Sequence, residues 1–94
     1  MKAVIDLHGY KLDEAEKALN NFISKAYEKG KRCIKVITGK GLRSGNDEGT
    51  IKRNIKYWLN SDVNRGKIVT FTYAKKSDGG EGALYILIKR IKLV

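Results

Sequence analysis

The chain of 94 residues is long enough for one domain only, since two halves would each bury too little apolar surface to fold. Lys and Arg number 20 against 10 Asp and Glu, and the net charge of +10 favours a polyanion such as nucleic acid or an anionic membrane surface. No apolar run approaches the roughly 20 residues that span a bilayer, and the amino terminus shows no export signal. A single cysteine excludes an internal disulfide. We therefore expect one cytoplasmic, monomeric domain over residues 1–94.

The first half of the chain begins with a short β-branched segment, residues 3–7, typical of a buried strand. Apolar residues then recur at spacings of three and four from Leu12 to Ala26, which predicts an amphipathic helix ended by Gly30. Asp13 with Glu16 has the form of a capping box, although a start one turn earlier fits as well.

The remaining strands are predicted from β-branched or alternating apolar runs: Cys33 to Thr38, Lys67 to Ala74 and Ala83 to Ile91. A glycine-rich polar loop, residues 39–49, leads to a second amphipathic helix over residues 51–59. Thr50 and Asp47 are the alternatives for the N-cap of this helix. The element order is therefore βαβαββ.

This order predicts an α/β fold, a two-layer sandwich of a four-stranded mixed sheet and two helices. Strand–helix–strand units place their strands in parallel, and a hairpin returns the last strand antiparallel. Parallel strands end at one edge of the sheet, so the loops after residues 7 and 38 should meet there. The loop over residues 75–82 joins them if the third strand is also parallel. The helix amino termini, which attract anions, should lie at the same edge.

The segment from Thr38 to Gly45 reads TGKGLRSG. Its glycines allow the backbone to approach an anion closely, and its basic and hydroxyl side chains can donate hydrogen bonds to a phosphate. The spacing is not that of a Walker loop, and an ordinary glycine-rich connection fits equally well. The candidate phosphate-binding residues here are Thr38, Gly39, Lys40, Gly41, Arg43 and Ser44.

Asp6 and His8 lie two residues apart at the end of the first predicted strand, so their side chains point the same way. Asp6 would hold one imidazole nitrogen and leave the other as a general acid or base near neutral pH. On RNA this base would activate a 2′-hydroxyl; on DNA it would activate water or help to hold a metal. The alternative is a strand-end histidine bonded to backbone. Two ligands are too few to predict a metal site, and magnesium stays open as a cofactor.

Further candidates surround these two segments. Gly80 and Gly82 belong to a glycine-rich turn that would form an anion-binding nest or simply close a hairpin. Tyr10 would stack on a base or shield the first helix. The second helix carries three basic residues without an intervening acid: Lys52, Arg53 and Lys56. Such a surface fits contact with a phosphodiester backbone, although a run of charges is usually just a solvated helix face.

Three segments in this order resemble the Smr (small MutS-related) domain family: Ile5 to Gly9, Ile37 to Ser44 and Gly79 to Tyr85. The resemblance covers essentially the whole chain and implies a fold like the carboxyl-terminal domain of translation initiation factor three. It also implies nucleic-acid binding with nicking or RNA-cleaving endonuclease activity. Within the family's D-L-H-G signature, Asp6 and His8 would be catalytic. The glycine-rich segments, with Thr38 and Lys40, would bind or position the nucleic-acid backbone.

The first functional hypothesis is an endonuclease acting on RNA or structured DNA, metal-independent or weakly metal-assisted. His8 would be its acid/base, Asp6 the orienting partner, and Lys40 with loop N–H groups would stabilise the phosphorane. The second is a non-catalytic module that binds nucleic acid or the ribosome. A phosphometabolite enzyme ranks below both, because a charge of +10 exceeds what a small anion needs. Mismatch-repair or recombination proteins are further expected partners.

Overall fold

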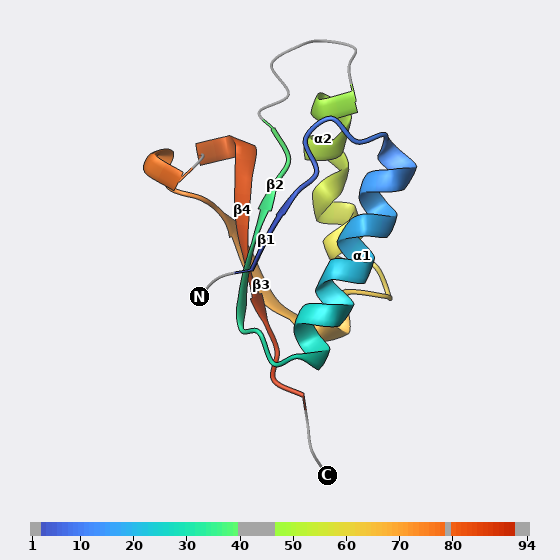
Figure 1. Ribbon diagram of the computed structural model, residues 1–94, viewed down its shortest axis with the longest axis vertical. Coiled ribbons are helices and arrows are strands. Elements are labelled where there is room, and N and C mark those ends of the chain that lie inside the picture. Colours follow the sequence, from blue (N-terminus) through green and yellow to red (C-terminus); the bar gives the residue numbers. More distant parts are fainter. Residues whose placement is uncertain (1–2, 40–46, 79, 92–94) are drawn as a thin grey trace.

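The computed structural model describes residues 3–39, 47–78 and 80–91 (Figure 1). Its helices and strands occur in the predicted βαβαββ order: β1 (Ala3–Asp6), α1 (Leu12–Glu28), β2 (Cys33–Ile37), α2 (Asp47–Leu59), β3 (Ile68–Tyr73) and β4 (Ala83–Ile88). Short 3-10 turns lie at Arg65–Lys67, Lys76–Asp78 and Gly80–Gly82. Within the described ranges, no helix has the length and apolar character needed to cross a bilayer.

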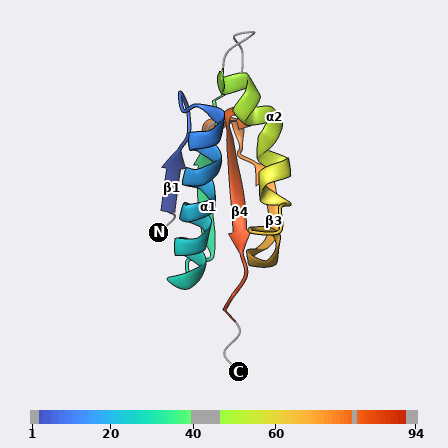
Figure 2. The ribbon, with the colours of Figure 1, turned by 90° about the vertical axis from the view of Figure 1, so that its right-hand side faces the viewer.

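The sheet has four strands in the order β1-β2-β4-β3. β1 and β2 pair in parallel, and β4 runs antiparallel to both of its neighbours, so β3 points the same way as β1 and β2. Both helices cover one face of the sheet (Figures 1 and 2). The predicted two-layer mixed sheet is confirmed, and the ends of β1, β2 and β3 all point to one edge.

The core lies between the two helices and the inner face of the sheet. Alternate residues of the central strand β4 point inward, and three of them are fully buried: Leu84, Ile86 and Ile88. They belong to one apolar cluster with Leu19 and Ile23 of α1 and with Ile51 and Ile55 of α2. The helical spacing that predicted α1 and α2 is therefore the spacing of their buried faces.

The helix ends show which sequence signals were read correctly. Gly30 ends α1 at φ +73°, with Gly30 N–H donated to Tyr27 and Lys31 N–H donated to Ala26, which is a Schellman motif. The Asp13–Glu16 capping box is wrong, because α1 begins at Leu12 and Glu14 instead accepts the Lys11 N–H at 3.3 Å.

The N-cap expected for α2 is also wrong. The helix already begins at Asp47, so Asp47 and Thr50 lie within its first turn and neither precedes it.

β1 is less buried than its apolar sequence predicted. It is an edge strand, and the register places Val4 opposite Lys35, on the face that the helices leave open. Val4 is consequently 52% exposed. The last strand also ends earlier than Ile91, because its partners begin at Cys33 and Ile68 and pairing stops at Ile88.

A buried asparagine ties the segment before β3 to both helices. Asn64 is fully buried, and its Nδ2 donates to the carbonyl of Trp58 at 2.8 Å and to Asn20 Oδ1 at 2.7 Å. These bonds join the end of α2 to the middle of α1. The Trp58 carbonyl also accepts the N–H and the hydroxyl of Ser61, so Asn64 is one of several donors that fasten this segment to the end of α2.

We expect Asn64→Ala to lower the free energy of unfolding by about 1–3 kcal/mol, because Asn20 Oδ1 and the Trp58 carbonyl each lose one donor. Urea denaturation followed by circular dichroism measures this loss. The matched control is Asn21→Ala on the exposed face of α1, where alanine favours the helix and stability should not fall. Equal stability of the two variants would contradict the structural role of Asn64.

Candidate functional site

The ends of three strands meet at one edge of the sheet. Leu7 N–H donates to Ile37 at 2.7 Å, which extends the β1–β2 pairing past the end of β1. Thr38 and Gly39 both donate their N–H groups to the carbonyl of Gly82, at 2.9 and 3.1 Å. The predicted convergence of the three loops is thereby confirmed for the residues next to the strands.

The turn after β1 presents His8 at this edge. Tyr10 N–H donates to the Leu7 carbonyl at 3.0 Å, and Gly9 has φ +84° while no residue type other than glycine has a positive φ in the described chain. Residues 7–10 therefore form a type II turn with glycine at its third position. Leu7 is fully buried and anchors the turn, whereas His8 and Tyr10 are exposed.

Asp6 holds this turn through the backbone. Its Oδ1 accepts the N–H of His8 at 2.9 Å, the pattern of an Asx turn. Each residue of the D-L-H-G segment thus has a physical role, since Asp6 closes the turn, Leu7 anchors it, Gly9 supplies the left-handed conformation, and His8 projects from it. The orientation of the imidazole by the Asp6 carboxylate stays a prediction.

Thr38 and the neighbouring amides are used inside the protein. The Thr38 side chain is fully buried, and its Oγ1 donates to the carbonyls of Gly39 at 2.9 Å and Gly82 at 3.4 Å. Gly80 N–H donates to Lys75 at 2.9 Å. The N–H groups of Thr38 and Gly39 therefore bind the residue before β4, and that of Gly80 binds within its own loop. These bonds give the edge its shape. Lys40, Gly41, Arg43 and Ser44, also predicted to contact phosphate, lie outside the described residues.

Two lysines of the predicted basic surface on α2 contact the ring of Tyr73, a residue that the sequence analysis did not predict as part of the site. The Nζ atoms of Lys52 and Lys56 lie 5.9 and 5.6 Å from the ring centre of Tyr73, within cation–π range. Tyr73 ends β3 and is 38% exposed. Arg53 is exposed one residue beyond Lys52. The position of Tyr73 at the end of a predicted strand could have indicated a site residue. The alternation of apolar residues and threonines along β3 instead led to its interpretation as a strand residue only.

The described residues hold no group of three or more His, Cys, Asp or Glu side chains close enough together for a metal ion. Asp6 and His8 lie together at this edge, joined by the bond from the His8 N–H to Asp6 Oδ1. The chemistry that an exposed imidazole can perform there is proton transfer.

The chain is a small two-layer α/β domain with a four-stranded mixed sheet, and comparison with known proteins gives the family. The family model described as the Smr domain matches residues 5–89. The chain therefore belongs to the Smr domain family.

Three similar proteins illustrate the family. Ribosome rescue factor SmrB of Shewanella sp. (strain ANA-3) is 33% identical over 85 residues, which are 90% of this chain and 43% of SmrB. Endonuclease MutS2 of Finegoldia magna is 32% identical over 89 residues, which are 95% of this chain and 10% of MutS2. The crystal structure of YdaL, a stand-alone small MutS-related protein from Escherichia coli, superposes with a TM-score of 0.81 at 25% identity. This match covers 94% of the chain and 65% of YdaL. The chain thus spans less than half the length of SmrB.

The geometry of the His8 turn generates a stability prediction. Gly9→Ala should lower the free energy of unfolding by about 1–2 kcal/mol, because an L side chain is strained at a φ of +84°. Nothing lies within 4 Å of a Cβ at Gly9, so the loss would come from the backbone alone. Gly66→Ala is the control, since its Cβ also meets open space and its φ is not in the left-handed region. If the two variants unfold at the same urea concentration, the turn assignment is wrong.

Proposed function

We propose that this domain binds RNA or DNA at the edge formed by the ends of β1 and β2 and the start of β4, and cuts a phosphodiester bond there. One observation carries the proposal. The only histidine of the chain is exposed on a turn that Asp6, Leu7 and Gly9 hold in one conformation. A rigid turn presenting the chain's single imidazole beside a glycine-lined strand junction is suited to proton transfer on a bound backbone.

On RNA, the imidazole of His8 would take the proton of a 2′-hydroxyl as its oxygen attacks the adjacent phosphorus. The bond from phosphorus to the 5′-oxygen then breaks, and that oxygen takes up a proton. The products are a 2′,3′-cyclic phosphate and a 5′-hydroxyl end. On DNA, which lacks the 2′-hydroxyl, His8 would activate water instead. Lys40 and Arg43, next along the chain from Gly39, would supply charge to the developing phosphorane.

The other residues of the edge would position the strand. Thr38 is buried, so it would act by holding the β2 end against Gly82 and not by touching phosphate. Tyr10 is 42% exposed beside His8 and would stack on a base. Lys52 and Lys56, held near Tyr73, would contact phosphates along α2.

The relatives support an RNA substrate associated with the ribosome. SmrB is named as a ribosome rescue factor and MutS2 as an endonuclease, and the domain compared here is the part that this chain shares with both. We therefore propose RNA cleavage near ribosomes as the first activity to test. A binding module without chemistry is the second candidate, because the lysine–tyrosine cluster on α2 and β3 would bind nucleic acid whether or not His8 reacts.

His8→Ala should abolish cutting, with a loss of at least about 100-fold, because a general acid/base contributes that much or more. Labelled single-stranded RNA and supercoiled plasmid are incubated with wild type and variant, with magnesium and with chelator, and products are resolved on gels. The dissociation constant of the variant for RNA should stay within about twofold. Equal product from wild type and variant would eliminate the catalytic hypothesis and leave the binding module.

Substitutions of Asp6 distinguish two alternative roles of its carboxylate, which are closing the turn and placing a negative charge beside the imidazole of His8. If it acts by closing the turn, Asp6→Asn should keep most of the activity, because an amide oxygen also accepts the His8 N–H, whereas Asp6→Ala should lose about tenfold or more. Initial cutting rates of the two variants across pH measure this. If Asp6→Asn is as inactive as Asp6→Ala, the charge of Asp6 on the imidazole is what matters.

A further inference from the structure

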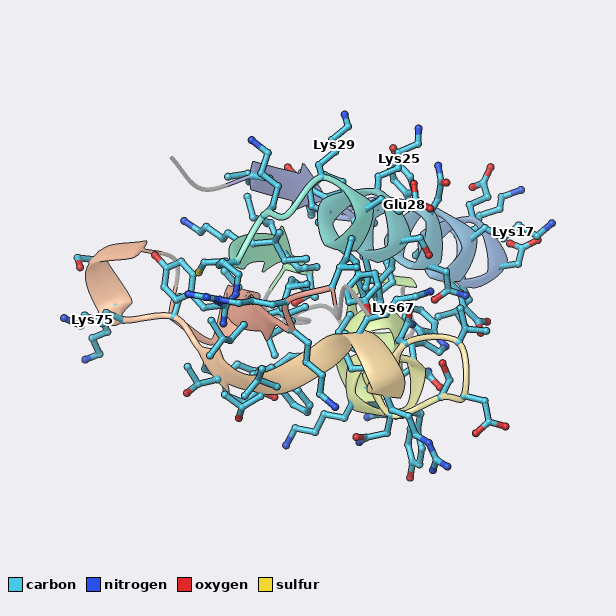
Figure 3. All side chains as sticks on the ribbon, turned by 90° about the horizontal axis from the view of Figure 1, so that it is seen from below. Lys17, Lys25, Glu28, Lys29, Lys67 and Lys75 are labelled. Carbon is cyan, nitrogen blue, oxygen red and sulfur yellow. The ribbon has the colours of Figure 1, made fainter. Side chains whose placement is uncertain are left out.

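The excess positive charge of the described residues lies mainly at the end of the sheet opposite His8. Three segments form this far end: residues 24–32, 61–68 and 87–91 (Figures 1 and 3). Together they carry eight Lys or Arg and two acids, Glu28 and Asp62. Residues 6–17 and 75–82, at the His8 edge, carry four Lys and six acids. Attraction of a polyanion to these segments is therefore directed to the far end.

The far end is also hollowed. A cavity of about 500 Å³ is lined by Glu28, Lys29, Gly30, Arg32, Arg90 and Ile91. Three of these six residues are cationic and one is anionic. Figure 3 looks at this end and shows Lys29 and Glu28 at the end of α1. A concave surface with excess cations concentrates positive potential and fits an anionic group.

Arg32 is held in place at this cavity. Its Nε donates to the carbonyl of Ile88 at 2.9 Å, and its own carbonyl accepts the N–H of Ile88 at 2.8 Å. This reciprocal pair fastens Arg32 to the end of β4. The two terminal amino groups of the guanidinium carry four further N–H donors in a planar fork, a geometry that matches phosphate.

Three backbone carbonyls at the carboxyl end of α1, where the helix dipole is negative, are hydrogen-bonded here. The carbonyls of Lys25, Ala26 and Tyr27 accept the N–H groups of Lys29, Lys31 and Gly30, respectively. These last-turn carbonyls are therefore engaged by backbone donors, which weakens their repulsion of an anion in the cavity.

We propose that this cavity is a second phosphate-binding site that anchors a polynucleotide backbone away from His8. The choice of ligand rests on the proposed function. β4 links the two sites, since its first residue follows Gly82 and its last is Ile88. Six strand residues span about 20 Å, so a single-stranded substrate must be several nucleotides long to reach both sites. The anchor would hold a long substrate while the His8 edge acts on a distant bond.

The test variant is Lys29→Gln/Arg90→Gln, which removes two exposed cations of the cavity and keeps the structural Arg32. The control, Lys17→Gln/Lys35→Gln, removes the same charge from the outer side of α1 and the open face of the sheet. Binding of a 12-nucleotide single-stranded RNA is measured by fluorescence anisotropy from 50 to 300 mM KCl. We expect the test variant to bind roughly tenfold more weakly at 100 mM, with a salt slope lower by about 1.4, that is, two phosphate contacts. Equal weakening in the control would show a net-charge effect only and overturn the proposal.

A second measurement locates the contact directly. Amide resonances of ¹⁵N-labelled wild type are followed while the same RNA is added, and Gly30, Arg32 and Arg90 should shift. Shifts confined to residues 8–10, 38–39 and 82 would overturn the anchor. An equally strong effect of a glutamate peptide on Gly30, Arg32 and Arg90 would instead assign this end to an acidic protein.

The two proposals fail separately. If neither wild type nor any variant cuts RNA but the binding and resonance results hold, the anchor stands and the endonuclease proposal falls. If wild type cuts, the Lys29→Gln/Arg90→Gln variant should raise KM for the 12-mer while cutting a dinucleotide, too short to reach the cavity, at the wild-type rate. Unchanged KM for the 12-mer would remove the anchor and leave the endonuclease proposal intact.

Discussion

The arrangement of the strand ends beside His8 depends on the carbonyl group of Gly82. Gly82, immediately before β4, accepts the N–H groups of Thr38 and Gly39 and also the Thr38 hydroxyl. This junction holds the end of β2 against the start of β4, and β2 in turn holds the turn after β1 through the bond from Leu7 to Ile37. Gly82 is itself buried at this meeting of backbones. The placement of the His8 turn relative to Thr38, Gly39 and Gly82 follows from these bonds.

Among the described residues, His8 and the larger cationic excess lie at opposite ends of the sheet. The His8 edge carries the imidazole, the Asp6-closed turn and the shared Gly82 junction, while the described segments around it are slightly acidic. The far end carries the larger cationic excess and the cavity beside Arg32. Long-range attraction of a polyanion does not require the cations to lie beside the reacting group. Under the two proposals above, one end of this domain would capture a polyanion and the other would act on it.

Several features were within reach of sequence reasoning. The three and four spacing of apolar residues in α1 is the spacing of a buried helical face, and Gly30 ended that helix as predicted. The D-L-H-G segment was recognised, although its turn geometry needed coordinates. The contacts of Tyr73 and the cavity at Arg32 were not anticipated. Both join residues far apart in the chain, from elements whose adjacency depends on the strand order.

By itself the sequence determined the element order, the family signature and a strongly cationic chain, because periodicity, glycine positions and charge are local properties. Only the tertiary structure decided which strand became an edge, that the Thr38 hydroxyl and amides face inward, and where the cations gather. Inserting β4 between β2 and β3 brings Gly82 to Thr38 at one end and Ile88 to Arg32 at the other. Such non-local pairings follow from how the whole sheet buries its apolar face, which no single segment encodes.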